Sequence, residues 1–150
     1  MSTTPEGFRG PSVEATIEQI RYWVPTISDV ARILEAREDE SWLLLLDPHL
    51  ATACPVAIAL RQDGRFDISL AGETYEDRAV KSLDQLVALL ERIVDGDVIR
   101  RSWCSTATGA PQGVETHVRL GAGVVFRNGP IPADGASCCD RHFLPYRRPL

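Results

Sequence analysis

The chain has 150 residues, of which 44% are hydrophobic and 25% are charged, with a formal net charge of −5. This composition is typical of one soluble globular domain and excludes collagen-like and low-complexity classes. The excess of acid disfavours binding to a phosphate backbone, and no apolar run approaches the roughly 18 residues of a membrane helix. We therefore expect neither a nucleic-acid partner nor a membrane.

The first eleven residues contain prolines and glycines among small polar residues, and no periodic apolar residues. This composition predicts a disordered arm over residues 1–11. The segment has no basic stretch followed by an apolar one, which a secretion signal would have, so we expect a cytoplasmic protein. Thiols are kept reduced in that compartment, and the four cysteines are expected to be free.

Two short amphipathic helices are expected at the start of the folded region. The first begins after Ser12, a candidate N-cap, and ends at Pro25. Its apolar residues recur at helical spacing and are Val13, Ile17, Ile20 and Val24. The second begins after Ser28, with an apolar face formed by Val30, Ile33 and Leu34.

The middle of the chain predicts antiparallel strands, beginning with the run "WLLLL" at 42–46, which has the length of a strand. A hairpin is expected over 54–72, and its loop decides its register. A three-residue loop over 62–64 pairs apolar with apolar residues: Val56 with Leu70, Ile58 with Ile68, and Leu60 with Phe66. A two-residue loop would pair apolar with polar residues, so we prefer the longer one. The stretch "GETYEDRAV" indicates a further short strand.

A central helix is predicted in "SLDQLVALLERIVDG". Ser82 and Gln85 have the spacing of a capping box, and Gly96 stands where a helix ends. Strands are expected next in "DVIRRSWCST", "GVETHVRL" and "VVF". From residue 128 onward, prolines and glycines disfavour regular structure and predict an irregular tail.

These elements predict an α+β fold with an antiparallel sheet of about five or six strands. The two N-terminal helices and the central helix would pack on one face of this sheet. Residues 12–127 would form a single domain, followed by the irregular tail over 128–150.

The function that the sequence favours is a small binding or assembly module, without catalytic activity of its own and without a cofactor. We expect it to be a homodimer. The tail is rich in arginine and aromatic residues, which are enriched at protein interfaces, and it is a candidate contact for a partner protein. Its candidate interaction residues are His142, Phe143, Tyr146, Arg147 and Arg148.

Two alternatives remain open. In "VETHVRL" the alternation of a strand puts Glu115, His117 and Arg119 on one polar face. If the sheet encloses a pocket, this acid, imidazole and cation would line it in an enzyme or small-ligand carrier. The third hypothesis is a structural zinc module, because imidazole and thiolate are preferred zinc ligands. Its candidate ligands are Cys104, His117, Cys139 and His142.

Overall fold

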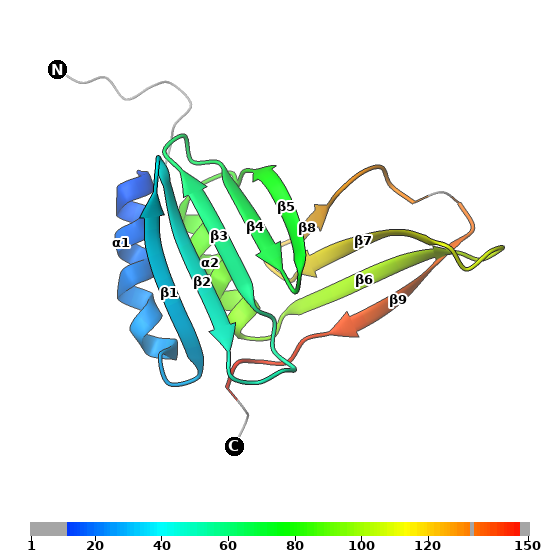
Figure 1. Ribbon diagram of the computed structural model, residues 1–150, viewed down its shortest axis with the longest axis horizontal. Coiled ribbons are helices and arrows are strands. Elements are labelled where there is room, and N and C mark those ends of the chain that lie inside the picture. The colour runs from blue at the N-terminus through cyan, green and yellow to red at the C-terminus, as the bar shows by residue number, and fades with distance from the viewer. Residues whose placement is uncertain (1–11, 133, 148–150) are drawn as a thin grey trace.

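The computed structural model describes residues 12–132 and 134–147. Its helices are α1 (Val13–Trp23) and α2 (Asp84–Val94), with a 3₁₀ helix over Val24–Ile27. The first five strands are β1 (Ala31–Glu38), β2 (Ser41–Pro48), β3 (Val56–Arg61), β4 (Phe66–Leu70) and β5 (Glu73–Arg78). The last four are β6 (Val98–Ser105), β7 (Pro111–Val118), β8 (Val124–Arg127) and β9 (Ala136–His142). The fold is of mixed helix and strand with two antiparallel sheets (Figure 1).

The predicted first helix is confirmed. The Ser12 hydroxyl accepts a hydrogen bond from the Ala15 N–H at 3.1 Å, which satisfies one of the unpaired donors of the first turn. The α-helix ends at Trp23, and Pro25 lies in the 3₁₀ turn that follows. Its buried residues include Ile17 and Ile20, which pack in the core as the spacing predicted.

The predicted second helix is wrong, because this stretch forms strand β1. Leu34 pairs with Leu45 and Ala36 with Leu43, in an antiparallel hairpin with β2. The turn begins at Asp39, which adopts φ +56°, a conformation that aspartate tolerates better than most residues. Three apolar residues at helical spacing were too few to outweigh pairing with the leucine-rich β2.

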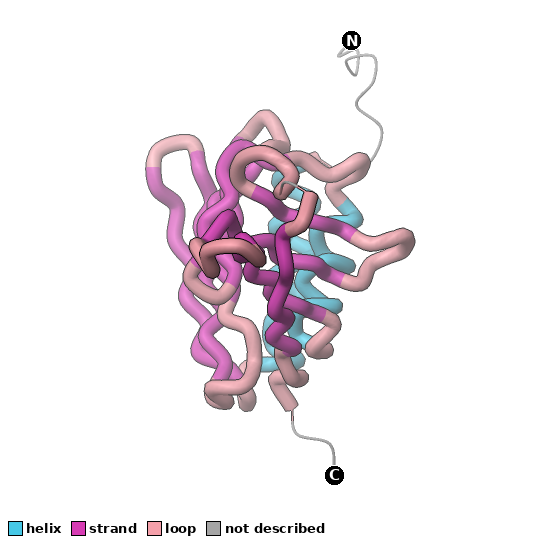
Figure 2. Tube along the Cα trace, turned by 90° about the vertical axis from the view of Figure 1, so that its right-hand side faces the viewer, coloured by secondary structure: helices cyan, strands magenta, loops and turns pink. Residues whose placement is uncertain are grey.

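The five-stranded sheet has the order β1-β2-β3-β4-β5, so each strand pairs with its neighbour in sequence. The predicted hairpin register is confirmed: Val56 pairs with Leu70, Ile58 with Ile68, and Leu60 with Phe66. One face of this sheet is covered by the helices, and the rotated view in Figure 2 shows them together on one side of it. We call this helix-covered side the inner face.

The central helix is confirmed as α2, but its expected capping box is absent. Leu83 occupies the N-cap position and no side chain caps the helix. The buried face comprises Leu86, Leu89, Leu90 and Ile93. Gly96 follows the helix with φ +85°, as expected for a residue that ends a helix.

The remaining strands form a second sheet of order β8-β7-β6-β9. This corrects two expectations, a single sheet of five or six strands and an irregular tail from residue 128. The sequence Ala136–His142 is strand β9, which pairs along β6. Proline and glycine gather in the segment before β9 and leave the strand itself free of both.

The two sheets meet where β5 approaches β8, through side chains. The Arg78 guanidinium donates to the Arg127 carbonyl at 2.6 Å, and the Asn128 amide donates to the Thr74 carbonyl at 2.8 Å. On the inner side, the Tyr75 hydroxyl lies 2.8 Å from the Thr116 hydroxyl. These contacts join the two sheets, and both sheets contribute residues to one core.

Candidate functional site

We call the face of the four-stranded sheet that points away from the core its outer face, and it brings together two of the residues expected to line a pocket. Glu115 and His117 are both on β7, and the Glu115 Oε2 lies 3.3 Å from the His117 Nε2. Arg119 follows the end of the strand, and its backbone N–H donates to the Asp97 carbonyl at 2.9 Å. The alternation of β7 places Arg119 on the same face.

Glu115 differs from a solvated carboxylate because it is only 3% exposed. Its Oε2 accepts a hydrogen bond from the Arg127 guanidinium at 2.5 Å, and its Oε1 accepts one from the Trp103 indole N–H. Burial raises the pKa of Glu115, but the hydrogen bonds from Arg127 and Trp103, together with the nearby positive charge, outweigh it, so the pKa lies below its ordinary value. The carboxylate is therefore charged and held in place.

Four strands contribute to a row of side chains that crosses this face. Asp140 of β9 pairs with Arg101 of β6, Arg101 with Glu115, and Glu115 with Arg127 of β8. The signs alternate along the row, and the Arg101 guanidinium donates to both Asp140 oxygens at 2.8 and 2.9 Å. Opposite charges on neighbouring strands stabilise one another, so this row fixes the register of the sheet.

A second row lies beside the first and forms part of a cavity of about 280 Å³. Its order across the sheet is His142, Ile99, His117 and Val125. At one end the cavity is lined by Arg119 and by residues of the turn that connects β7 to β8. Sequence reasoning placed His142 in an irregular tail, and only the pairing of β9 with β6 brings it to the same cavity as His117.

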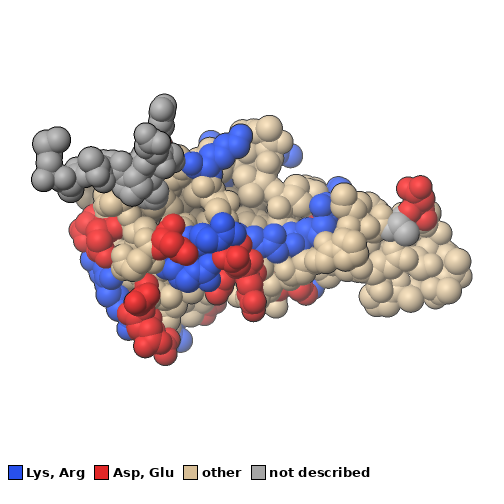
Figure 3. All heavy atoms as spheres, turned by 90° about the horizontal axis from the view of Figure 1, so that it is seen from above, with Lys and Arg blue, Asp and Glu red and all other residues tan. Residues whose placement is uncertain are grey.

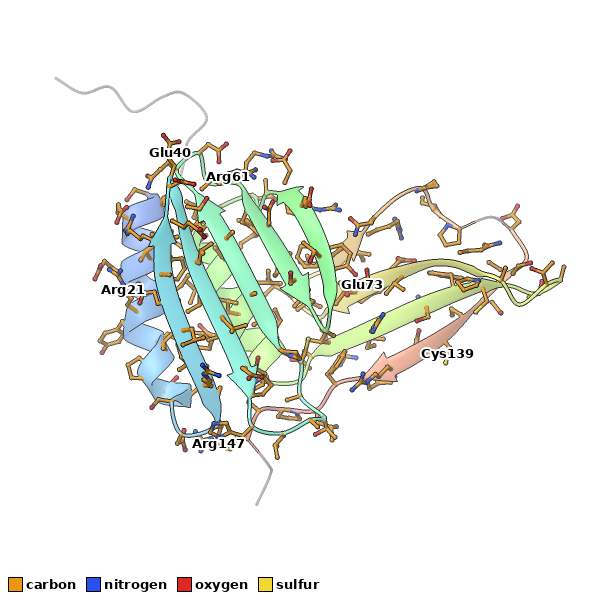
Figure 4. All side chains as sticks on the ribbon, viewed as in Figure 1. Arg21, Glu40, Arg61, Glu73, Cys139 and Arg147 are labelled. Carbon is orange, nitrogen blue, oxygen red and sulfur yellow. The ribbon has the colours of Figure 1, made fainter. Side chains whose placement is uncertain are left out.

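The expected zinc ligands are not brought together. His117 and His142 lie on the outer face, whereas the alternation of β6 and β9 turns Cys104 and Cys139 to the opposite face. Figure 4 shows Cys139 on β9, at the edge of the second sheet. Across residues 12–132 and 134–147, no group of three or more His, Cys, Asp or Glu side chains is arranged to hold a metal ion.

The expected interaction tail is largely occupied by contacts within this chain. Phe143 and Tyr146 are buried, and the Tyr146 hydroxyl donates to the Cys54 carbonyl at 2.6 Å. The Arg147 guanidinium donates to both Asp29 oxygens, at 2.7 and 2.9 Å. Arg148 lies outside the described residues. The aromatic side chains that suggested a docking segment therefore serve the chain's own core.

The outer face of the five-stranded sheet has an apolar character that sequence reasoning did not anticipate. Alternate residues of β1, β2 and β3 line a shallow hollow of about 380 Å³: Leu34, Ala36, Leu43, Leu45, Ala57 and Ala59. The side opposite the helices thus carries apolar side chains where a half-exposed sheet usually has polar ones. The signal was present in the run 42–46, which is apolar at every position and predicts a strand with two apolar faces.

Charged side chains do not form a field of one sign on the side that Figure 3 displays. Basic and acidic side chains lie next to one another there, and the projecting end of the second sheet is mostly uncharged. The ion pairs agree with this picture, since Arg61 and Arg65 both contact Asp77. A surface on which both signs of charge alternate does not attract a polyanion such as a nucleic-acid backbone.

Comparison of the chain with protein-family models, with curated proteins and with solved structures finds no match. Neither helix in the described ranges has the length and apolar character needed to cross a bilayer. The two candidate sites are the apolar hollow on the five-stranded sheet and the cavity on the four-stranded sheet.

Proposed function

We propose that this protein is a cytoplasmic binding and assembly module, without chemistry of its own, that forms a homodimer through the outer face of its five-stranded sheet. The observation that carries the proposal is the apolar hollow on that face. Leu34 is 45% exposed at one side of it. Exposed apolar patches with polar rims mark protein interaction sites more often than an ordinary surface does. The four cysteines are free, which agrees with a reducing compartment.

The shape of the hollow supports a second copy of the chain as its occupant. Leucines of β1 and β2 form a ridge, and Ala57 and Ala59 of β3 form a trough beside it. A two-fold axis that lies in the plane between the two faces, parallel to the strands, would set the ridge of each copy into the trough of the other. Self-complementary surfaces of this kind are what a symmetric dimer requires.

The size of the face indicates a weak dimer. With strands about 4.8 Å apart and residues about 3.3 Å apart, five strands of about six residues present roughly 480 Å² per copy. Two copies would bury about 960 Å², which is below the roughly 1,200 Å² at which stable complexes begin. We therefore expect association that depends on concentration.

The test is the solution mass measured by sedimentation velocity over a wide range of protein concentration. The wild-type protein should pass from monomer to dimer, and Leu34→Lys should remain monomeric because it places a charge on the ridge. Val125→Lys is the matched control, since Val125 is also 45% exposed but lies on the other sheet. Truncation of the C-terminal segment is unsuitable as a test because it would remove β9 and two buried aromatic residues.

Two results would contradict the proposal. A wild-type protein that stays monomeric at every concentration would exclude the homodimer. A dimer that persists in both Leu34→Lys and Leu45→Lys would place the interface elsewhere on the molecule.

A further inference from the structure

The cavity on the outer face of the four-stranded sheet is separate from the proposed dimer face and has the features of a small-ligand site. Its volume of about 280 Å³ lies near the lower end of the range for ligand pockets, about 300 Å³. Its lining includes the apolar side chains Ile99 and Val125 and the rings of His117 and His142. Polar and apolar groups contribute about equally to the lining, and sites for small molecules combine apolar surface with polar groups that fix the ligand's orientation.

The charge that is left unmatched at this cavity is positive. Asp97, which also lines the cavity, has its Oδ2 3.6 Å from the Arg92 guanidinium, and the buried Glu115 is paired with Arg127. Within residues 12–132 and 134–147, no ion pair neutralises Arg119. Asp97 and Glu115 therefore each have a cationic partner, whereas Arg119 has no acidic partner among the described residues.

The two histidines add hydrogen-bonding groups at opposite sides of the apolar lining. They flank Ile99 across two strand spacings, which places their backbones about 10 Å apart. The His117 Nε2 is buried and faces the Glu115 carboxylate. Since Glu115 is itself fixed by Trp103 and Arg127, its carboxylate has a set position beside the His117 ring, although no hydrogen bond joins the two side chains.

We propose that this cavity binds a small organic anion whose carboxylate or phosphate group contacts Arg119. The short apolar part of the ligand would lie over Ile99 and Val125, between the two imidazole rings. This class of ligand matches the arginine of the lining, which has no ion pair among the described residues, the mixed polar and apolar lining, and the small volume. The inference does not depend on the proposed dimer, and the monomeric Leu34→Lys variant should bind the same probes.

The experiment is a titration of the full-length protein with butyrate and, separately, with inorganic phosphate, at constant pH and ionic strength. Binding is followed by the NMR signals of the histidine rings. The signals of His117 and His142 should shift in a saturable way with at least one of the two anions. His49, which follows β2 in the other sheet, serves as an internal control and should not shift. Butyrate and phosphate distinguish a carboxylate ligand from a phosphate ligand.

Arg119→Met should weaken binding at least about tenfold, because it removes the charge and keeps much of the side chain's length. Arg32→Met, on β1 of the other sheet, is the matched control and should leave the affinity unchanged. Arg119 is exposed, so its replacement should leave the fold intact.

Three outcomes would overturn the inference. The first is that neither anion shifts the His117 and His142 signals. The second is that butyramide, the uncharged analogue, binds as well as butyrate. The third is that Arg119→Met binds the anions as tightly as the wild-type protein does.

Discussion

The two sheets share one core, but their outer faces have opposite chemistry. On the five-stranded sheet, the outer face carries leucines and alanines at alternate positions of β1, β2 and β3. On the four-stranded sheet, it carries a row of alternating charges, with the buried Glu115 near its centre. An apolar outer face provides surface for association, whereas a paired, charged face provides fixed polar groups at a small cavity.

The two sheets also differ in how their strands are brought together. Every pair in the five-stranded sheet joins strands that are neighbours in sequence, while β9 reaches β6 from the C-terminal end of the chain. Short-range pairing requires little loop closure, and long-range pairing must be held by contacts made elsewhere. Tyr146 and Arg147 supply such contacts beyond β9. The following predictions test this contrast.

The largest expected change in the free energy of unfolding comes from substitutions that compare the two faces of β2. Leu44 is 3% exposed on the inner face, and Leu44→Ala should lower the free energy of unfolding by about 3 kcal/mol through lost burial and a cavity. Leu43, its neighbour on the outer face, is half-buried, and Leu43→Ala should cost about 1 kcal/mol. Urea denaturation at low protein concentration checks both values. Equal costs would mean that the outer face is packed as tightly as the core.

The next largest change in the free energy of unfolding is expected from loss of Glu115, the buried charge of the four-stranded sheet. Glu115→Ala leaves Arg127 and Trp103 without their acceptor and should lower the free energy of unfolding by about 2 to 3 kcal/mol. The control is Glu76→Ala on β5, where the side chain is exposed and the cost should stay below about 0.5 kcal/mol. Similar values for both variants would contradict a structural role for Glu115.

The same carboxylate predicts a dependence on pH. Its pKa is lower in the folded state than its ordinary value, so the charged form stabilises the fold above the ordinary pKa. This contribution is lost as the pH falls through the folded-state pKa. Glu115→Gln lacks it, so the stability difference between the wild-type protein and this variant should shrink on acidification. Chemical denaturation of both proteins from neutral to acidic pH measures the difference, and a constant value would contradict the assignment.

A smaller effect tests the attachment of the C-terminal segment. Gly96 has φ +85°, and a Cβ atom there would lie 2.6 Å from the Pro145 nitrogen. Gly96→Ala should therefore cost about 2 kcal/mol, from backbone strain and displacement of that segment. Gly72 in the β4–β5 turn has φ +92° but open space around it, so Gly72→Ala should cost only about 1 kcal/mol. Thermal unfolding measures both variants: Gly72→Ala reports the backbone strain alone, and Gly96→Ala reports that strain together with the contact with Pro145.

The smallest effect tests the exposed end of the charged row. Arg101 and Asp140 side chains are 31% and 27% exposed, so their coupling energy should be only about 0.5 kcal/mol and should decrease with salt. A double-mutant cycle with Arg101→Met and Asp140→Asn measures it. A coupling as large as that of Glu115 with Arg127 would show that burial does not decide the strength of these pairs.

The elements that the sequence determined by itself are those whose signals are local. Ser12 with its helical repeat, the 62–64 loop with its apolar pairs, and Gly96 at the end of α2 each depend on residues within a few positions. The Ser12 cap, the hairpin register and the end of α2 are decided by such neighbours. The alternation that put Glu115 and His117 on one face of a strand is local too.

The tertiary structure alone decided the features whose partners lie far away in sequence. Strand β1 exists because β2 pairs with it, and β9 exists because β6 offers an unpaired edge. The burial of Glu115 depends on Arg127 and Trp103, and the cavity depends on His142 arriving from the end of the chain. Pairing and burial are properties of the assembled sheet, so no local pattern could have specified them.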